Sequence, residues 1–234
     1  MNITKLSGLI AMAMAIPATT YADICKDIEV GGKVTLSKDT TTEGCTATLK
    51  KDTVIEGDGV RKITTGKHGL VIKLNGHALA LKKVNIDFSG DFAIAVHGNN
   101  VATDKVVFEN VTLNDLAKIE CKQAGARVAA IVWKAKQADI NLTAMNAKVR
   151  FGVVIGAPMP PGEHKGELKD LGTATISGPI AHCEGKWKYG GQAVFAFERD
   201  VKYPGGTVHS VGPCDINLGM PMLLLRDHGL PSLQ

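Results

Sequence analysis

Short segments in which every second residue is apolar return five times between Gly69 and Leu218. These first segments are residues 70–74, 92–96, 129–133, 153–157 and 193–197. A second segment with the pattern apolar-x-x-apolar-x-apolar follows each of them, at residues 81–86, 108–113, 142–147, 171–176 and 211–216. Alternation with this period predicts β-strands. Its return between polar, Gly-rich spacers of uneven length predicts the stacked coils of a solenoid.

The alternation also predicts which side chains face the core. In the segment 129–133 we expect Ala129, Ile131 and Trp133 to point inward, with Ala157 following Trp133 on the next coil. The residues between the inward ones should form two small, mostly apolar outward columns: Val71, Ala93, Ala130, Val154 and Val194, and Lys73, Ala95, Val132, Gly156 and Ala196. In the second segments the inward column is Val84, Val111, Met145, Ala174 and Cys214, and the polar outward row is Asn85, Thr112, Asn146, Thr175 and Asp215.

One coil cannot bury its own apolar row, whereas coils stacked about 4.8 Å apart join their rows into one core. The chain length fits one domain. We therefore expect an all-β, single-domain parallel β-helix of about six to seven coils. Its parts are a leader (1–22), an N-terminal cap with irregular first coils (23–60), the β-helix coils (61–218), and a C-terminal cap or tail (219–234) whose Met222–Leu225 run covers the last coil. The alternative is a β-sandwich of antiparallel hairpins, but it needs turn dipeptides at regular short spacing.

The N-terminus predicts export. A lysine precedes the apolar run LSGLIAMAMAIPA, and a small residue, Ala22, precedes Asp23, as in a cleaved secretory signal peptide. No other run has the length that a bilayer requires, so we expect no membrane span in the mature chain. The formal net charge of +4 is spread along the chain and aromatic residues make up 5%, which argues against a nucleic-acid partner. The style of the leader is bacterial, which indicates a periplasmic or extracellular protein.

Five cysteines lie beyond the leader, and exported chains meet an oxidising compartment in which disulfides persist. Cys25 and Cys45 are close in sequence and should staple the N-terminal edge. Cys121 and Cys183 follow their second segments at similar offsets, so they form a plausible second pair. Cys214 would then stay unpaired, and its place in the inward column favours an inert core thiol over a reactive one.

The run TLKKDTVIEGDG, followed by coils such as VVFENVTL, resembles right-handed parallel β-helix proteins of the pectin-lyase-like superfamily over residues 30–218. The resemblance is one of fold-level pattern. It implies polysaccharide as the substrate class, because many members cleave or bind acidic glycans along one flank. Lyases of that superfamily hold Ca²⁺ with carboxylates, so Ca²⁺ is expected here only if this chain is a lyase; otherwise we expect no cofactor or metal. The hydrolase branch uses paired aspartates, a His-Gly element and Arg-x-Lys; this chain has His68-Gly69 and His97-Gly98 but neither of the other elements.

One column at the strand ends carries candidate chemistry. It comprises Asn75, His97, Lys134, Pro158 and Glu198, with Arg199 adjacent and Lys73 on the neighbouring outward column. His97 or Lys134 could act as a catalytic base. The candidate ligand-binding set is Lys73, Asn75, His97, Lys134, Glu198 and Arg199. The alternative is a solvated strand end, because strand ends are commonly polar without a function.

Three functions remain open from the sequence. The favoured hypothesis is an exported protein whose flank binds a polysaccharide without catalysis. The second is a lyase acting on an acidic glycan, with His97 or Lys134 as its base. The third is a structural or adhesive envelope protein whose apolar outward columns dock a partner or a second copy of the chain.

Overall fold

The computed structural model describes residues 24–124, 127–149, 151–156, 173–180, 183, 194–197, 201–203 and 208–211. Every strand pairing in these ranges is parallel. In chain order the elements are α1 (Ile24–Val30), β1 (Gly32–Thr35), β2 (Thr40–Thr42), β3 (Cys45–Thr48), β4 (Thr53–Glu56), β5 (Lys62–Thr65), β6 (Leu70–Lys73), β7 (Ala78–Lys82), β8 (Asn85–Phe88), β9 (Ile94–His97), β10 (Lys105–Asp115), the 3₁₀ turn η1 (Cys121–Gln123), β11 (Val128–Trp133), β12 (Gln137–Asn146), β13 (Phe151–Gly156), β14 (Thr173–Ser177), β15 (Val194–Phe197), β16 (Val201–Lys202) and β17 (Val208–Val211).

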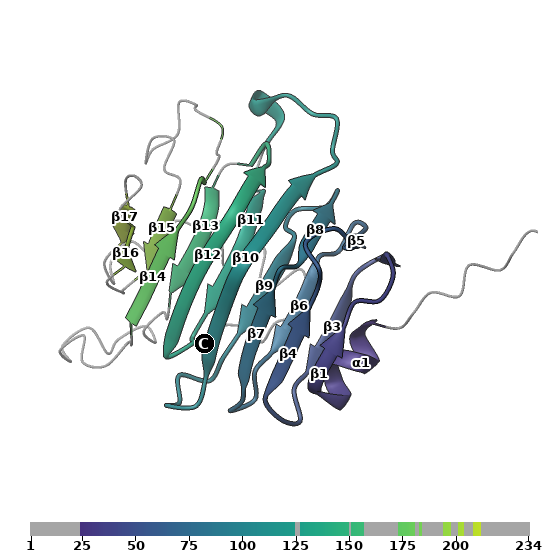
Figure 1. Cartoon of the computed structure of the whole chain (residues 1–234). Coiled ribbons are helices and arrows are strands. Elements are labelled where there is room, and N and C mark those ends of the chain that lie inside the picture. Colours follow the sequence, from purple (N-terminus) through teal and green to yellow (C-terminus); the bar gives the residue numbers. More distant parts are fainter. Residues whose placement is uncertain are drawn as a thin grey trace, which may run out of the picture.

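The strands form two parallel sheets, and the chain alternates between them (Figure 1). Sheet A has ten strands in the order β1-β4-β7-β10-β12-β14-β16, with β2, β5 and β8 paired alongside. Sheet B has seven, in the order β17-β15-β13-β11-β9-β6-β3. Because each strand of sheet B before β17, the last described strand, is followed in the chain by a strand of sheet A, the chain coils from one sheet to the other and back. The all-β, solenoid-like arrangement expected from the sequence is therefore observed.

Sheet A bends along a line that the sequence pattern did not reveal. The early coils place two short strands, such as β7 and β8, where a single second strand was expected. In the next coil the long strand β10 pairs with β7 over its first half and with β8 over its second half. Lys83 and Asn110 adopt left-handed backbone conformations at this bend, and in the preceding coil Gly57 lies against the Lys83 carbonyl. An ordered change of direction thus recurs at the same place in successive coils.

The register of sheet A corrects the expected second-segment columns. Asn85 does pair with Thr112, but Asn146 pairs with Asn114 because the β10–β12 ladder has register shifts between Phe108 and Thr112. Thr175 lies beside Asp139 in the first half of the sheet. Ala174 pairs with Ala138, so it does not continue the column of Val84 and Val111. Asp215 and Cys214 lie outside the described residues.

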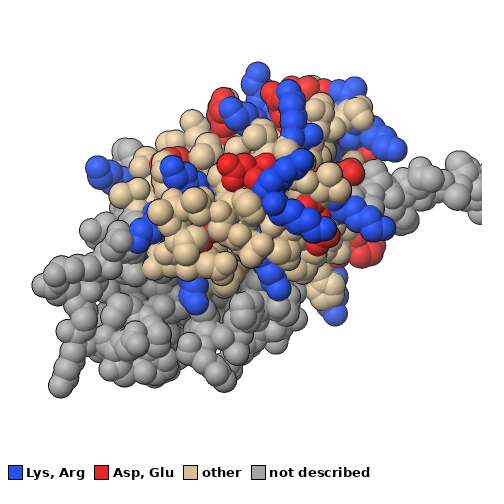
Figure 2. Space-filling view, turned by 90° about the horizontal axis from the view of Figure 1, so that it is seen from below, with Lys and Arg blue, Asp and Glu red and all other residues tan. Residues whose placement is uncertain are grey.

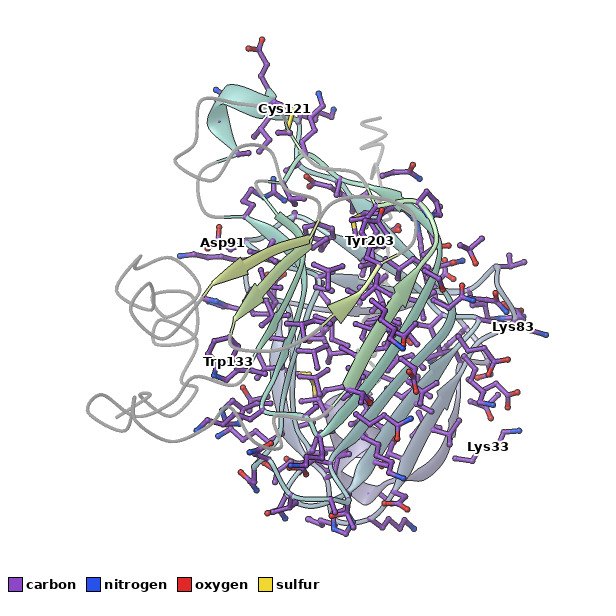
Figure 3. The ribbon with its side chains drawn as sticks, turned by 90° about the vertical axis from the view of Figure 1, so that its left-hand side faces the viewer. Lys33, Lys83, Asp91, Cys121, Trp133 and Tyr203 are labelled. Atoms are coloured by element: carbon purple, nitrogen blue, oxygen red, sulfur yellow. A yellow bond between two sulfur atoms is a disulfide. The ribbon has the colours of Figure 1, made fainter. Side chains whose placement is uncertain are left out.

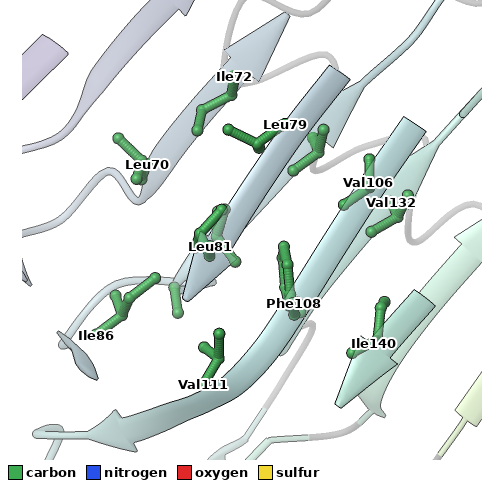
Figure 4. Packing of buried hydrophobic residues seen from close by; sticks show 14 of the residues in the cluster. Leu70, Ile72, Leu79, Leu81, Ile86, Val106, Phe108, Val111, Val132 and Ile140 are labelled. Carbon is green, nitrogen blue, oxygen red and sulfur yellow. The ribbon is translucent and has the colours of Figure 1, made fainter. Parts of the chain in front are cut away.

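The core lies between the two sheets and consists of inward aliphatic and aromatic side chains (Figure 4). Leu70 and Ile72 of sheet B face residues such as Leu81 and Phe108 of sheet A. On β11 the core includes Ala129, as expected, together with Ala130 and Val132, which were expected outside. The expected inward positions of Ile131 and Trp133 were wrong. Ala93, also expected outside, belongs to the core as well. A shift of one residue moves every side chain to the opposite face of a sheet.

The N-terminal edge is covered by α1, an element that the sequence pattern did not predict. Ile24 and Ile28 of this helix are buried in the core, and a disulfide joins Cys25 to Cys45 on β3 with a Cα–Cα distance of 6.1 Å. A covered edge strand cannot pair with another chain, which protects a parallel solenoid from aggregation. A second disulfide joins Cys121 to Cys183, with a Cα–Cα distance of 5.2 Å. Both bonded pairs are those that the sequence favoured.

Charged side chains of both signs mix over the face seen in Figure 2. Lys33 pairs with Glu56, and Lys82 pairs with Glu109 at 3.0 Å, on the outward face of sheet A. Within the described ranges, no helix combines the length and apolar character needed to cross a membrane.

Candidate functional site

The outward side of sheet B carries polar chemistry at the ends of its strands. Lys73, His97, Trp133 and Gly156 are register partners on β6, β9, β11 and β13, so they lie side by side on adjacent coils. Trp133 lies on the opposite side of the molecule from Lys33, which projects from sheet A (Figure 3). The partner of Trp133 on the next coil is Gly156 rather than the expected Ala157.

His97 is the central residue of this column. Only 6% of it is exposed, and its Nε2 atom is buried without a hydrogen-bond partner. Burial, the largest cause, and the positive charges of Lys134 and Lys73 together lower the pKa of His97 to about 4, against the opposing effect of Asp104. The imidazole is therefore neutral at physiological pH, and its buried Nε2 atom has an unused hydrogen-bonding capacity.

The turn after β11 places the backbone of Lys134 against the turn that follows His97. Lys134 has a φ of 55°, and its carbonyl accepts a hydrogen bond from the Asn100 amide at 2.8 Å. Gly98 approaches the same carbonyl so closely that a Cβ there would lie 2.4 Å from the oxygen. Only glycine fits this contact without moving the backbone. Lys134 itself stays partly exposed, as does Lys73.

Asp104 stabilises the same turns through buried hydrogen bonds. It is fully buried, and its carboxylate accepts hydrogen bonds from the backbone amides of Gly76 at 3.1 Å, Val101 at 3.2 Å, and Asn99. Backbone donors of this kind stabilise a buried carboxylate without a cationic partner. Asp104 thus fixes the loops that carry Asn75 and His97, and it supplies the negative charge that partly offsets the lysines.

Three of the six expected ligand-binding residues, Lys73, His97 and Lys134, come together. Asn75 lies on the adjoining exposed turn, with a φ of 53° and its side-chain amide donating to the Leu49 carbonyl at 3.3 Å. Pro158, Glu198 and Arg199 lie outside the described residues.

Trp133 and Asp104 were missed from the sequence. Trp133 was assigned to the core because β11 is apolar at every position, which gives no signal for its outward face. Asp104 is a single aspartate in a loop, and no motif marks it. The turn residues Gly98 and Asn100 beside His97 were the available hint of a tightly held loop.

A second polar row runs along the outward side of sheet A. Asn146 donates to Asn114, and Asn114 donates to Asp87, each at 2.9 Å, while Lys62 pairs with Asp87 at 2.8 Å. These groups satisfy one another, so the row stabilises the stacking of coils, whereas the Nε2 atom of His97 has no hydrogen-bond partner.

The side chains of Lys73, His97 and Lys134 can bind a ligand, but their arrangement shows little that would catalyse the breaking of a bond. Two ammonium groups suit anionic oxygens, and the His97 nitrogen can share a hydrogen bond with a hydroxyl or carboxylate. A histidine with a pKa near 4 is a weak base at neutral pH, where catalytic bases work best with a pKa near the operating pH. Within the described residues, no three His, Cys, Asp or Glu side chains are grouped so that they could hold a metal ion.

Comparison of the chain with protein-family models, with curated proteins and with solved structures gave no match.

Proposed function

We propose that this protein is an exported parallel β-helix protein, of right-handed pectin-lyase-like type, that binds an acidic polysaccharide. The observation that carries the proposal is the meeting of Lys73, His97 and Lys134 on the outward edge of sheet B. Residues from three coils contribute to it, so an extended polymer could contact the edge along the stacking direction. The leader and the two disulfides support an oxidising, extracytoplasmic location.

Acidic glycans fit this edge better than neutral ones. Each uronic acid carries a carboxylate beside hydroxyl groups, and the edge offers two ammonium groups beside a neutral imidazole. Lys73 and Lys134 are partly exposed, whereas only 6% of His97 is exposed. The two lysines therefore contact the glycan first, and the imidazole interacts with it only at short range. The low basicity of His97 at neutral pH favours binding over turnover.

The test is a binding titration of the mature chain with polygalacturonate and with alginate, with neutral dextran as the comparison. The variant Lys73→Gln/Lys134→Asn removes both charges, and asparagine tolerates the left-handed backbone at position 134. Two partly exposed ion pairs contribute up to about 2 kcal/mol, so we expect affinity for the acidic polymers to fall by up to about thirtyfold. Lys105→Gln, on the outward face of sheet A, is the matched control and should bind as the wild type does.

Equal affinity of the double variant and the wild type would refute the assignment of the site. Absence of binding to both acidic polymers would refute the ligand class. Growth of ultraviolet absorbance from an unsaturated product, lost in His97→Ala or Lys134→Ala, would establish a lyase in place of a binding protein.

A further inference from the structure

The outward face of sheet B is apolar and buried, although it lies outside the core between the sheets. Val71, Ala95, Ile131 and Val154 are register partners across β6, β9, β11 and β13, and each is at most 3% exposed. Trp133, beside this row, is 1% exposed. None of these side chains belongs to the core cluster.

The outward face of sheet A differs from that of sheet B in its exposure. Its outward residues Val54, Ala80 and Val107 occupy one column and remain partly exposed. A parallel sheet whose residues are both apolar and buried on both faces is covered on both faces. The outward face of sheet B therefore requires a second layer, whereas that of sheet A faces solvent.

We propose that the C-terminal segment 212–234 forms this layer, with its apolar run 220–225 packed on the outward row of sheet B. The segment begins directly after β17, the edge strand of sheet B, so it starts next to the face that it would cover. This inference does not rest on the proposed glycan ligand, although the covered face borders that site, because Trp133 is the register partner of His97. It also differs from a cap on the last coil, because it places the run over side chains and not over an unpaired strand edge.

Length and composition support this occupant. Sheet B has seven strands, which at about 4.8 Å per strand extend about 29 Å. The segment 212–234, at about 3.3 Å per residue, can reach about 75 Å when extended, so it can cross the whole sheet. The run 220–225 reads MPMLLL and has no charge, whereas the segment 157–172 carries Glu163, Lys165, Glu167, Lys169 and Asp170. The leader is more apolar still, but export would remove it.

Trp133 provides a direct probe of the cover. The chain has two tryptophans, so Trp187→Phe leaves Trp133 as the only one. In this background we compare the full mature chain with a chain that ends at Val211, and with Leu224→Asp in the full-length chain. Ser232→Asp adds the same charge to the same segment outside the apolar run, and is the matched control. The readouts are the emission maximum, quenching by acrylamide, far-ultraviolet circular dichroism and the oligomeric state.

We expect the truncation and Leu224→Asp to shift the emission of Trp133 to the red and to raise its quenching constant several-fold, with the strand signal of circular dichroism retained. Ser232→Asp should match the parent. If the truncated chain fails to fold, Leu224→Asp in the full chain decides the matter. A Trp133 that stays shielded in folded Leu224→Asp overturns the proposal. Exposure of Trp133 when the full-length Trp187→Phe chain is diluted from dimer to monomer would also overturn it, since a second copy would then be the cover.

Discussion

Protonation of His97 should destabilise the folded protein at mildly acidic pH. Its pKa is about 4 in the folded state and 6.5 for an unperturbed histidine. Above pH 6.5 the residue is neutral in both states and contributes no pH dependence. As the pH falls below that value, the unfolded chain takes up a proton that the folded protein refuses, so the free energy of unfolding falls. The loss levels off below the folded-state pKa.

The size of this effect follows from the two pKa values. One pKa unit corresponds to 1.36 kcal/mol, so the full loss amounts to about 3 kcal/mol once both states have titrated. Most of it should develop between about pH 6.5 and pH 4.5. Because a domain has only 5–15 kcal/mol of net stability, this is a loss that urea denaturation resolves readily.

The assay is urea denaturation followed by circular dichroism across this pH range, for the wild type, His97→Gln and His68→Gln. Carboxylates also titrate near the acid end, so the informative quantity is the difference in pH dependence between variants. We expect His97→Gln to lose the stability change assigned to the imidazole, and exposed His68→Gln to follow the wild type. Coincident pH profiles for His97→Gln and the wild type would refute the burial of a neutral imidazole between the lysines.

Three further substitutions test the surroundings of the site. Asp104→Asn places an amide donor against backbone N–H groups and should cost about 2 kcal/mol in urea denaturation; an unchanged midpoint would contradict the carboxylate's role. Gly98→Ala should lower the melting temperature and cost about 2 kcal/mol or more, because its Cβ meets the Lys134 carbonyl, and wild-type stability would show that this approach is looser than described. Replacing Cys121 and Cys183 by serine opens a loop spanning 62 positions and should cost about 4 kcal/mol by the chain-entropy relation; calorimetry showing no loss would mean that the bond restrains little.

Much of the fold follows from the apolar periodicity. Strands that bury one face, such as β7 and β12, alternate clearly, and their repeated return predicts parallel stacking. Closeness in sequence led to the Cys25–Cys45 pair, and similar offsets after the second segments led to the Cys121–Cys183 pair, because equivalent places on stacked coils lie close in space. The helix α1 was not predicted, since seven residues are too few to show a helical period.

The candidate site was harder to predict, because it depends on register. All six residues of β11 are buried, so the sequence pattern could not tell its two faces apart, and Trp133 was placed on the wrong one. In sheet A the shifts between β10 and β12 displaced Asn146 from the column of Thr112. His97 and Lys134 were identified because polar residues at strand ends stand out. Their meeting with Lys73 depends on backbone hydrogen bonds between coils, which no local pattern encodes.

The most direct test of the central claim is the set of backbone proton contacts across β6, β9 and β11, measured by nuclear Overhauser effects in a labelled sample. Parallel stacking in the observed register predicts contacts between the backbones of Lys73 and His97, and between those of His97 and Trp133. Contacts that run in the antiparallel sense, or that pair His97 with other residues, would contradict the assembly of this site from successive coils.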